Sequence, residues 1–281
     1  MRIAIVADSH LAERAPECVA NWKAAAGAVA RLRADLTVHL GDISLDGHVH
    51  PEELRFAREQ AEAWPTPIRF VPGNHDMGDG SGESPLDPRR LAAYEASFGA
   101  DHWAVSAGRW ELIGINAQLL GSGTPQEHAQ WQWLEDHVRR IQESRTCEHS
   151  VLFLHRPLLR PSGNEHHRAG RYVTHAACER LLNGPLRHSL RAVVSGHTHQ
   201  YLDRSVNGVR HLWLPSTAFV LPDEIQVRVG EKLVGLGMLE LGGSSVWFDL
   251  LCPDGMRRHQ LTELDFYTQT RRHMAEAETL R

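Results

Sequence analysis

The chain has 281 residues and a mass of 31.5 kDa, and 42% of its residues are hydrophobic and 23% charged. This composition supports a large folded core without disulfides, and it excludes collagen-like, coiled-coil and disordered chains. The 30 basic and 35 acidic residues leave a net charge of −5, which disfavours a nucleic acid polymer as partner because such proteins carry a basic surface.

The first part of the chain alternates short apolar runs with helical segments. Residues 3–7, 36–40 and 68–71 are apolar runs typical of strands that are buried on both faces. Helices are predicted between them over 16–33 and 51–64, each with a proline in its first turn. This strand–helix rhythm predicts a parallel α/β core.

The second part continues with a loop over 77–88, a helix over 88–98 and strands near 102–106 and 110–116. A capping box, Thr124-Pro-Gln-Glu127, starts the next helix. A strand over 150–154, a helix capped by Thr174, a strand over 191–195 and several short strands between 201 and 251 follow. Residues from about 260 are predicted to be helical. We therefore predict one catalytic domain over 1–255 and a helical C-terminal extension over 256–281.

The chain shows no targeting or membrane segment. Its first apolar stretch is short and is closed by Asp8, and no run reaches the roughly 18–20 apolar residues of a membrane span. Its four cysteines are scattered without a Cys-x-x-Cys pair, so reduced thiols are expected. These features predict a cytoplasmic protein.

Polar side chains follow five of the predicted strands at the point where each strand ends. They lie in Asp8-Ser9-His10, Gly41-Asp42, Gly73-Asn74-His75-Asp76, His155 and Gly196-His197-Thr198-His199. Loops at the carboxyl ends of strands line the ligand crevice of an open α/β sheet, so we expect these side chains to meet. Carboxylates and imidazoles gathered in one place repel or desolvate one another unless a cation joins them.

The types of side chain predict a transition-metal site. Mixed oxygen and imidazole ligands suit Mn, Fe, Zn, Co or Ni better than Mg or Ca. One ion with an open position needs three or four ligands, so seven donors are about right for two ions that share a ligand. The seven are Asp8, His10, Asp42, Asn74, His155, His197 and His199. Two neighbouring metals clamp the attacking and leaving oxygens of a phosphoryl transfer.

In this order the five blocks resemble the motifs of the calcineurin-like metallophosphoesterases, and they span residues 8–199. Asp8-Ser9-His10 and the segment Gln130-Trp-Gln-Trp-Leu134 resemble most the class III cyclic-nucleotide phosphodiesterases and glycerophosphodiesterases. The resemblance implies an α/β fold, a four-layer αββα sandwich of two mixed β-sheets flanked by helices.

The resemblance also implies a role for each residue. Asp8, His10 and His199 would bind one metal, Asn74, His155 and His197 the other, and Asp42 would bridge them. The cofactors would be two divalent or trivalent ions (Mn, Fe or Zn), with a hydroxide held between them that attacks the phosphorus. His75 is the implied catalytic residue, which donates to a phosphate oxygen or to the leaving alkoxide. Asn74, His75 and His199 would also contact the substrate.

Two positions depart from the pattern of many relatives. An acid often stands three residues after the bridging aspartate, whereas here Asp46 stands four residues after Asp42. Prolines often follow the histidine of the later strand, whereas here His155 is followed by Arg156, either a surface residue or a phosphate contact. Each block alone has an ordinary explanation as a polar turn, and it is their joint order that favours a metal site.

The sequence therefore predicts a dinuclear metal-dependent phosphoesterase that hydrolyses a P–O bond in a small phosphorylated substrate. A phosphodiester such as a cyclic nucleotide or a glycerophosphodiester is favoured, and a phosphomonoester is next. A nuclease is disfavoured by the net charge. A non-catalytic scaffold of the same fold is disfavoured because no ligand is missing. No membrane partner is expected, and a homo-oligomer is left open. Outside the blocks, His39 is expected to be a hydrogen-bonded structural residue, and His166 and His167 to lie in a solvated loop.

Overall fold

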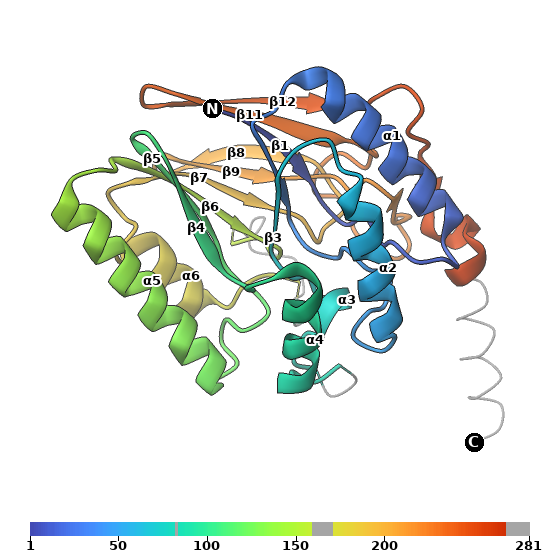
Figure 1. The fold of residues 1–281 in the computed structure, drawn as a ribbon, viewed down its shortest axis with the longest axis horizontal. Coiled ribbons are helices and arrows are strands. Elements are labelled where there is room, and N and C mark those ends of the chain that lie inside the picture. Colours follow the sequence, from blue (N-terminus) through green and yellow to red (C-terminus); the bar gives the residue numbers. More distant parts are fainter. Residues whose placement is uncertain (82–83, 159–170, 268–281) are drawn as a thin grey trace.

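A computed structural model describes residues 1–81, 84–158 and 171–267 (Figure 1). Two β-sheets pack face to face in its centre. The first sheet has the strand order β12 (Ser245–Leu251), β11 (Leu236–Gly242), β1 (Arg2–Val6), β2 (Leu36–His39) and β3 (Ile68–Phe70). Within it, β1, β2 and β3 are parallel, while β11 is antiparallel to both β1 and β12.

The second sheet contains six strands. Their order is β4 (Trp103–Ala107), β5 (Trp110–Gly114), β6 (His149–Leu154), β7 (Leu190–Ser195), β9 (Val209–Trp213) and β8 (Leu202–Val206). Strands β5, β6, β7 and β9 are parallel, and the two edge strands run antiparallel to them. Both sheets are therefore mixed, as predicted. A separate pair joins β10 (Phe219–Val220) to β13 (His259–Gln260) in parallel.

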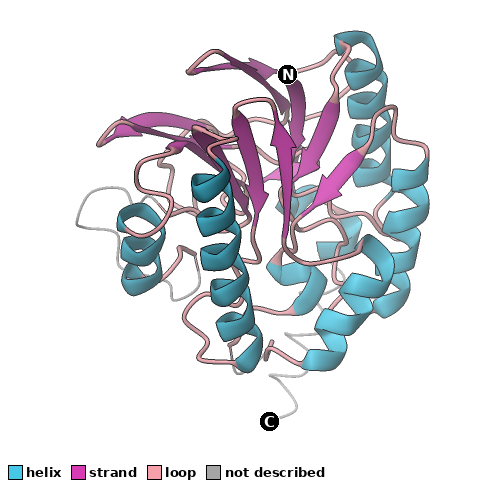
Figure 2. Ribbon diagram, turned by 60° about the vertical axis from the view of Figure 1, so that its left-hand side comes forward, coloured by secondary structure: helices cyan, strands magenta, loops and turns pink. Residues whose placement is uncertain are grey.

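Helices cover the outer faces of both sheets, which gives the four layers that Figure 2 shows from the side. The first sheet is covered by α1 (Pro16–Leu32), α2 (Pro51–Glu62) and α4 (Pro88–Phe98). The second is covered by α5 (Pro125–Ser144) and α6 (His175–Asn183). A single helical turn, α3 (Asn74–Met77), follows β3. The predicted αββα sandwich is confirmed.

The apolar runs are continuous because each central strand has two buried faces. In β1, Ile3 and Ile5 point into the core between the sheets, whereas Ala4 and Val6 pack under the helices. In β6 the same alternation places Val151 and Phe153 between the sheets, with their neighbours under α5 and α6. Because successive side chains of a strand point to opposite faces, one run of apolar residues contributes to the core between the sheets and to the core under the helices.

Most predicted elements lie within two residues of their predicted bounds. At α5, Thr124 Oγ1 accepts from the Glu127 amide at 3.2 Å, as expected of a cap. The Glu127 carboxylate does not return to Thr124; it accepts from the amides of Gly121 and Gly123 at 2.6 and 2.7 Å. Thr174 precedes α6 as predicted, but its side chain makes no capping hydrogen bond.

The C-terminal segment is partly different from the helix predicted there. Residues 259–260 form β13 beside β10, and a 3₁₀ turn follows over Leu261–Glu263. Leu264 and Phe266 are then buried among residues of the main fold, including Ala12 and Phe219. Residues 268–281 lie outside the described residues, and the division of the chain at residue 255 stays a prediction. None of the helices in the described ranges is both long and apolar enough to cross a bilayer.

Candidate metal centre

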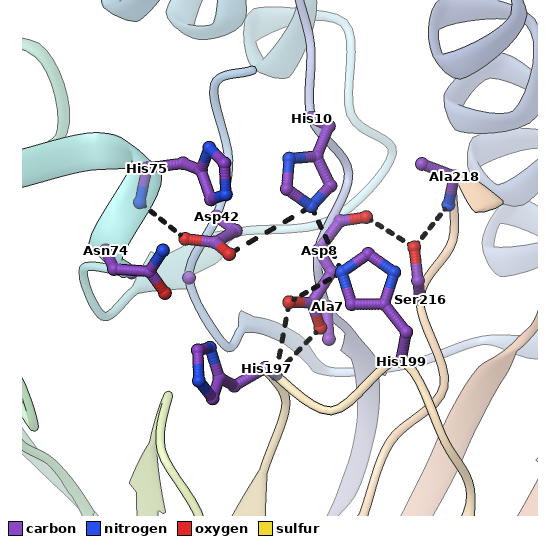
Figure 3. Close-up of polar contacts among 12 residues, drawn as sticks. Ala7, Asp8, His10, Asp42, Asn74, His75, His197, His199, Ser216 and Ala218 are labelled. Atoms are coloured by element: carbon purple, nitrogen blue, oxygen red, sulfur yellow. Dashed lines mark hydrogen bonds and ion pairs between the residues drawn. The ribbon is translucent and has the colours of Figure 1, made fainter. Parts of the chain in front are cut away.

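The five predicted blocks meet at the carboxyl ends of the parallel strands of both sheets. The loops after β1, β2 and β3 come from the first sheet, and those after β6 and β7 come from the second. Backbone hydrogen bonds connect them: the Asp8 amide donates to Gly41 O at 3.0 Å, and the Gly196 amide donates to His155 O at 3.0 Å. Figure 3 shows that the labelled side chains of four blocks gather at one place, and His155 Nε2 of the fifth block lies 3.0 Å from His197 Nδ1.

One group of ligand atoms contains Asp8, His10 and His199, all of which are buried. His10 Nε2 and His199 Nε2 lie 3.2 Å apart, and His199 Nε2 lies 3.5 Å from Asp8 Oδ1. The Asp42 carboxylate is next, 4.0 Å from His10 Nε2. These are the three residues that the resemblance assigns to the first metal, together with the assigned bridge.

The second group contains Asp42, His155 and His197, with Asn74 beside them. His155 Nε2 lies 3.3 Å from Asp42 Oδ2, 3.1 Å from Asn74 Oδ1 and 3.0 Å from His197 Nδ1. Asp42 is therefore within reach of both groups, which is the position required of a bridging ligand.

Hydrogen bonds on the outer side of two imidazoles turn their unprotonated nitrogens inward. His155 Nδ1 donates to Leu40 O at 2.8 Å, and His199 Nδ1 donates to Phe219 O at 3.0 Å. A carbonyl only accepts, so in the neutral rings Nε2 carries the lone pair. In the second group the lone pair of His155 then faces Asn74 Oδ1 and Asp42 Oδ2, both acceptors. Acceptors that face one another require a cation or a proton between them, so the donor set fits a metal ion.

The electrostatics of the cluster suit metal binding. Burial lowers the pKa of His199 to about 4, and it lowers that of His10 well below the usual range. Burial alone would lower the pKa of His155, but Asp42 raises it to about 9. Burial also raises the pKa of Asp8. At neutral pH His10 and His199 are thus neutral imidazoles, and His155 holds a proton that a cation would displace.

The backbone of the ligand loops is unusual. In the described chain eight residues other than glycine have positive φ, and five of them are Asp8, His10, Asp42, His197 and His199, with φ between 46° and 68°. This left-handed conformation is costly for residues with a Cβ atom, and it persists where the surrounding structure enforces it. Its concentration at the candidate ligands indicates that the loops are shaped to aim these side chains.

Gly73 allows two ligand loops to approach each other closely. A Cβ atom at this position would lie 2.1 Å from both the amide nitrogen and Oδ1 of Asp42. Glycine is therefore needed before Asn74 for a steric reason. The close approach also lets the His75 amide donate to Asp42 Oδ1 at 2.9 Å.

Asp76 is a positioning residue to which the sequence analysis gave no role. Its buried carboxylate accepts from the amides of Ile43, Ser44 and Gly73 at 2.9–3.2 Å, and from Ser44 Oγ at 2.7 Å. It therefore joins the loop after Asp42 to the loop that carries Asn74. The feature of the sequence that could have indicated this role is the position of Asp76 directly after Asn74-His75.

His39 has the structural role that was predicted, and it also ties two ligand loops together. Its Nδ1 accepts from the Gly41 amide at 3.2 Å, so the neutral ring donates from Nε2 to Ser9 Oγ at 2.8 Å. Ser9 Oγ in turn donates to Ile43 O at 3.0 Å. Burial lowers the pKa of His39 to about 3, which keeps this tautomer neutral.

His75 stands at the edge of the cluster, where its side chain is 39% exposed. Its Nδ1 donates to Leu45 O at 2.7 Å, and Asp46 Oδ1 is 3.8 Å away. Asp46 is closer to His48, at 3.2 Å from its Nδ1. The backbone carbonyl of Leu45, rather than the carboxylate of Asp46, therefore orients the His75 ring.

A cavity of about 420 Å³ opens directly above the ligands, within the usual size for a small-molecule site. Candidate ligands and the catalytic candidate line its floor: His10, Asp42, Asn74, His75, His197 and His199.

Arg156 does not line this cavity; it is buried and its Nη2 donates to Asp79 O at 3.2 Å. Arg156 is therefore not a surface residue, and its role as a phosphate contact stays a prediction. His166 and His167 lie outside the described residues.

The family model for the calcineurin-like phosphoesterases matches residues 1–201. The chain belongs to this family of metallophosphoesterases. A serine/threonine-protein phosphatase, CPPED1 of Bos taurus, is 30% identical over 139 residues, which cover 48% of this chain and 42% of that protein. A "probable cyclic nucleotide phosphodiesterase" of Psychrobacter sp. (strain PRwf-1) is 27% identical over 191 residues, which cover 67% of this chain and 53% of that protein. The chain thus spans about half the length of the curated relatives it matches.

Solved structures confirm the fold. A dimetal phosphatase from Danio rerio superposes with a TM-score of 0.60 at 16% identity, over 86% of this chain and 92% of that one. A purple acid phosphatase from yellow lupin seeds superposes with a TM-score of 0.67 at 14% identity, over 92% of this chain and 52% of that one. At these identities the likeness establishes the architecture alone.

Proposed function

We propose that the protein is a dinuclear metal-dependent phosphoesterase with the ligand assignment given above. The observation that carries this proposal is the convergence of His155 Nε2, Asn74 Oδ1 and Asp42 Oδ2 on one point, with separations of 3.1 and 3.3 Å from the imidazole nitrogen. The adjoining group of Asp8, His10 and His199 provides the second set of donors within reach of Asp42.

Two bound metals would supply Lewis-acid activation of water and neutralisation of phosphate charge. The protein supplies the positions of the reacting groups. The fixed loops hold the ligands without reorganisation, and Asn74 and His199 border the place where the phosphate must lie. His75 holds its Nδ1 proton on Leu45 O, so Nε2 is the atom that exchanges a proton or hydrogen bond with the phosphate or the leaving alkoxide.

A small phosphodiester is the favoured substrate class. The relative from Psychrobacter, named as a probable cyclic nucleotide phosphodiesterase, aligns with 67% of this chain. A cavity of about 420 Å³ holds a molecule of that size. A phosphomonoesterase is the second candidate because the alignment with the phosphatase CPPED1 reaches the higher identity, 30%, over a shorter segment.

The test combines metal analysis with turnover. Protein purified with Mn in the buffer should contain about two metals per chain and should hydrolyse bis(4-nitrophenyl) phosphate or 4-nitrophenyl phosphate. Chelation should abolish this turnover, and returned Mn should restore it. Turnover that survives complete removal of metal contradicts the proposal. The ratio of diester to monoester hydrolysis decides between the two substrate classes.

Two variants separate the role of a ligand from that of a proton donor. Asp42→Ala should remove most of the metal together with the activity. His75→Ala should keep the metal and lower kcat by roughly 100-fold, a typical contribution of general acid–base catalysis. His128→Ala, on an exposed position of α5, is the matched control and should change neither quantity. Equal metal loss in the first two variants would contradict the separation of roles.

A further inference from the structure

The cavity above the metal centre has two chemically different sides. Its floor is made of the candidate ligands, whereas an apolar wall is made of Leu45, Phe219, Leu221, Leu261, Phe266 and Tyr267. Five of these six residues lie beyond residue 201, where the match to the family model ends. The wall is therefore a feature of the C-terminal part of this chain, next to a floor that comes from the family motifs.

The wall is held in place by packing and by strand pairing. Strand β13 pairs with β10, with Phe219 opposite His259 and Val220 opposite Gln260. The Gln260 amide donates to Glu263 Oε2 at 3.3 Å, which closes the 3₁₀ turn after the strand. Phe266 is buried, and its ring centroid lies 6.1 Å from that of Phe219. The wall is thus formed by the fold itself, through strand pairing and buried aromatic packing.

Phe219 places this surface directly against the metal ligands. Its ring centroid lies 4.9 Å from that of His10 and 4.9 Å from that of His199. A phosphate held at the ligands therefore has its ester group within reach of the apolar wall. Polyols and charged groups would lose hydration there without gaining partners.

The charged residues at the rim balance one another. Arg14 and Arg171 line the cavity together with Asp46 and Asp79. Arg14 is already paired, since its Nε donates to Glu53 Oε1 at 2.8 Å. Among the described residues that line the cavity beyond the candidate ligands, two arginines and two aspartates therefore leave no net charge, which suits a neutral group.

We propose that the apolar wall selects phosphoesters whose ester group carries a neutral, flat apolar ring next to the phosphate, in preference to esters of glycerol or of small alcohols. This inference rests on the proposed function, because it assumes that phosphate binds at the metal centre. The flat ring packs on Phe219 and Tyr267 while the phosphate faces the ligands.

Binding of two phosphonates to the Mn-loaded protein tests the wall without requiring turnover. Benzylphosphonate and methylphosphonate share the metal-binding group and differ by one ring. Burial of roughly 70 Å² of that ring at about 25 cal/mol per Å² predicts binding that is tighter by on the order of tenfold to thirtyfold. Titration calorimetry gives both dissociation constants. Equal affinities for the two phosphonates overturn the inference.

Variants of the wall locate the effect. Leu261→Ala combined with Tyr267→Ala should reduce the preference to about threefold or less and leave methylphosphonate binding within about twofold of the parent. Both side chains are only partly buried, so the fold tolerates the change. Tyr267→Phe should keep the preference, because the ring and not the hydroxyl carries it. Tyr201→Ala is the matched control, a half-buried tyrosine that does not line the cavity. An unchanged preference in the double variant contradicts the inference.

The same experiment separates this inference from the proposed function. If methylphosphonate binds and 4-nitrophenyl esters are hydrolysed but the ring confers no preference, the wall has no selective role and the phosphoesterase proposal stands. If neither phosphonate binds the Mn-loaded protein and no phosphoester is hydrolysed, the proposed function is wrong, and the inference about the wall fails with it.

Discussion

The backbone amide of His197 donates hydrogen bonds to both carboxylate oxygens of Asp8, at 3.1 and 3.0 Å (Figure 3). Asp8 follows β1 of the first sheet, and His197 follows β7 of the second. Both residues have positive φ, 52° and 68°. This pair therefore joins the two sheets at the candidate metal centre, and each sheet positions a candidate ligand supplied by the other.

Asp8→Asn tests this contact between Asp8 and His197. The amide group that replaces one carboxylate oxygen sets a donor against the His197 amide and removes a negative charge from the first group of ligands. We expect about one metal per chain instead of two, and turnover lower by at least about 100-fold, equivalent to ~2.7 kcal/mol. Elemental analysis and kinetics on the same preparation measure both. Asp136→Asn on the surface of α5 is the control, and two tightly held metals in Asp8→Asn would refute the assignment.

Asp76→Asn tests the positioning role of a residue that binds no metal. The substitution replaces acceptor oxygens with an NH₂ group that faces backbone amides, so buried donors lose their partners. We expect a loss of about 2–4 kcal/mol in the free energy of unfolding, and metal affinity lower by about tenfold to 100-fold. Urea unfolding and metal titration measure the two effects.

Ser44→Ala provides the graded comparison for Asp76. It removes one hydrogen bond to the same carboxylate, at 2.7 Å, and should cost only about 1 kcal/mol. Metal binding by Ser44→Ala should remain close to that of the parent. If Asp76→Asn is as stable as the parent and binds metal equally well, the carboxylate does not position the loops.

Removal of metal should lower the thermal stability of the protein. The buried ligands face one another, and a cation that binds only the folded state stabilises it by about 2.7 kcal/mol when its concentration is 100 times the dissociation constant. For a chain of 281 residues the corresponding shift in Tm is roughly 5 °C. Scanning calorimetry before and after chelation measures it. The Tm of Asp42→Ala should not depend on Mn. If the Tm of the parent is the same with and without Mn, the result would contradict a bound cation.

His211 should make the stability of the protein depend on pH independently of the metal centre. This residue of β9 is 4% exposed, and burial lowers its pKa to about 4. The unfolded chain has a pKa near 6.5, so it binds the proton more readily than the folded state does. The stability from the neutral ring is fully present above about pH 6.5, and it is lost as the pH falls from there toward 4. At pH 5 the loss is about 2 kcal/mol.

His211→Leu isolates this effect. The difference in the free energy of unfolding between the parent and His211→Leu should shift by about 2 kcal/mol between pH 7.5 and pH 5, in favour of the variant at the lower pH. Subtracting the free energies of unfolding of the two proteins at each pH removes the contributions of the candidate metal ligands, which both proteins share. A difference that is constant over this range would show that His211 keeps an ordinary pKa when folded.

Short-range patterns were enough to predict the layers of the fold. The apolar runs around Ile3 and Val151 predict buried strands because every residue in them faces one of two cores, as the alternation in β1 and β6 shows. The convergence of the candidate ligands was predictable for a related reason. A polar residue directly after a buried strand has a fixed place at the end of the sheet, and the parallel strands bring those ends together.

The contacts around the ligands were not predictable in the same way. The role of Asp76 depends on amides 32–33 residues earlier in the chain, and Phe219 O reaches His199 only because β10 runs beside the ligand loop. The C-terminal helix was predicted to begin at about residue 260, yet residues 259–260 pair as β13, Leu261–Glu263 form a 3₁₀ turn, and helical residues begin at 265. The local sequence of this segment carries no sign of a partner strand about 40 residues away.

The sequence by itself determined the seven candidate ligands, the order in which they occur and the family to which the chain belongs, because residue type and placement after a strand are local properties. Only the tertiary structure decided which residues orient those ligands and what covers the cavity. Both depend on the way two sheets pack and on where the last described segment docks, and these contacts between distant parts of the chain are selected by shape and burial across the whole core.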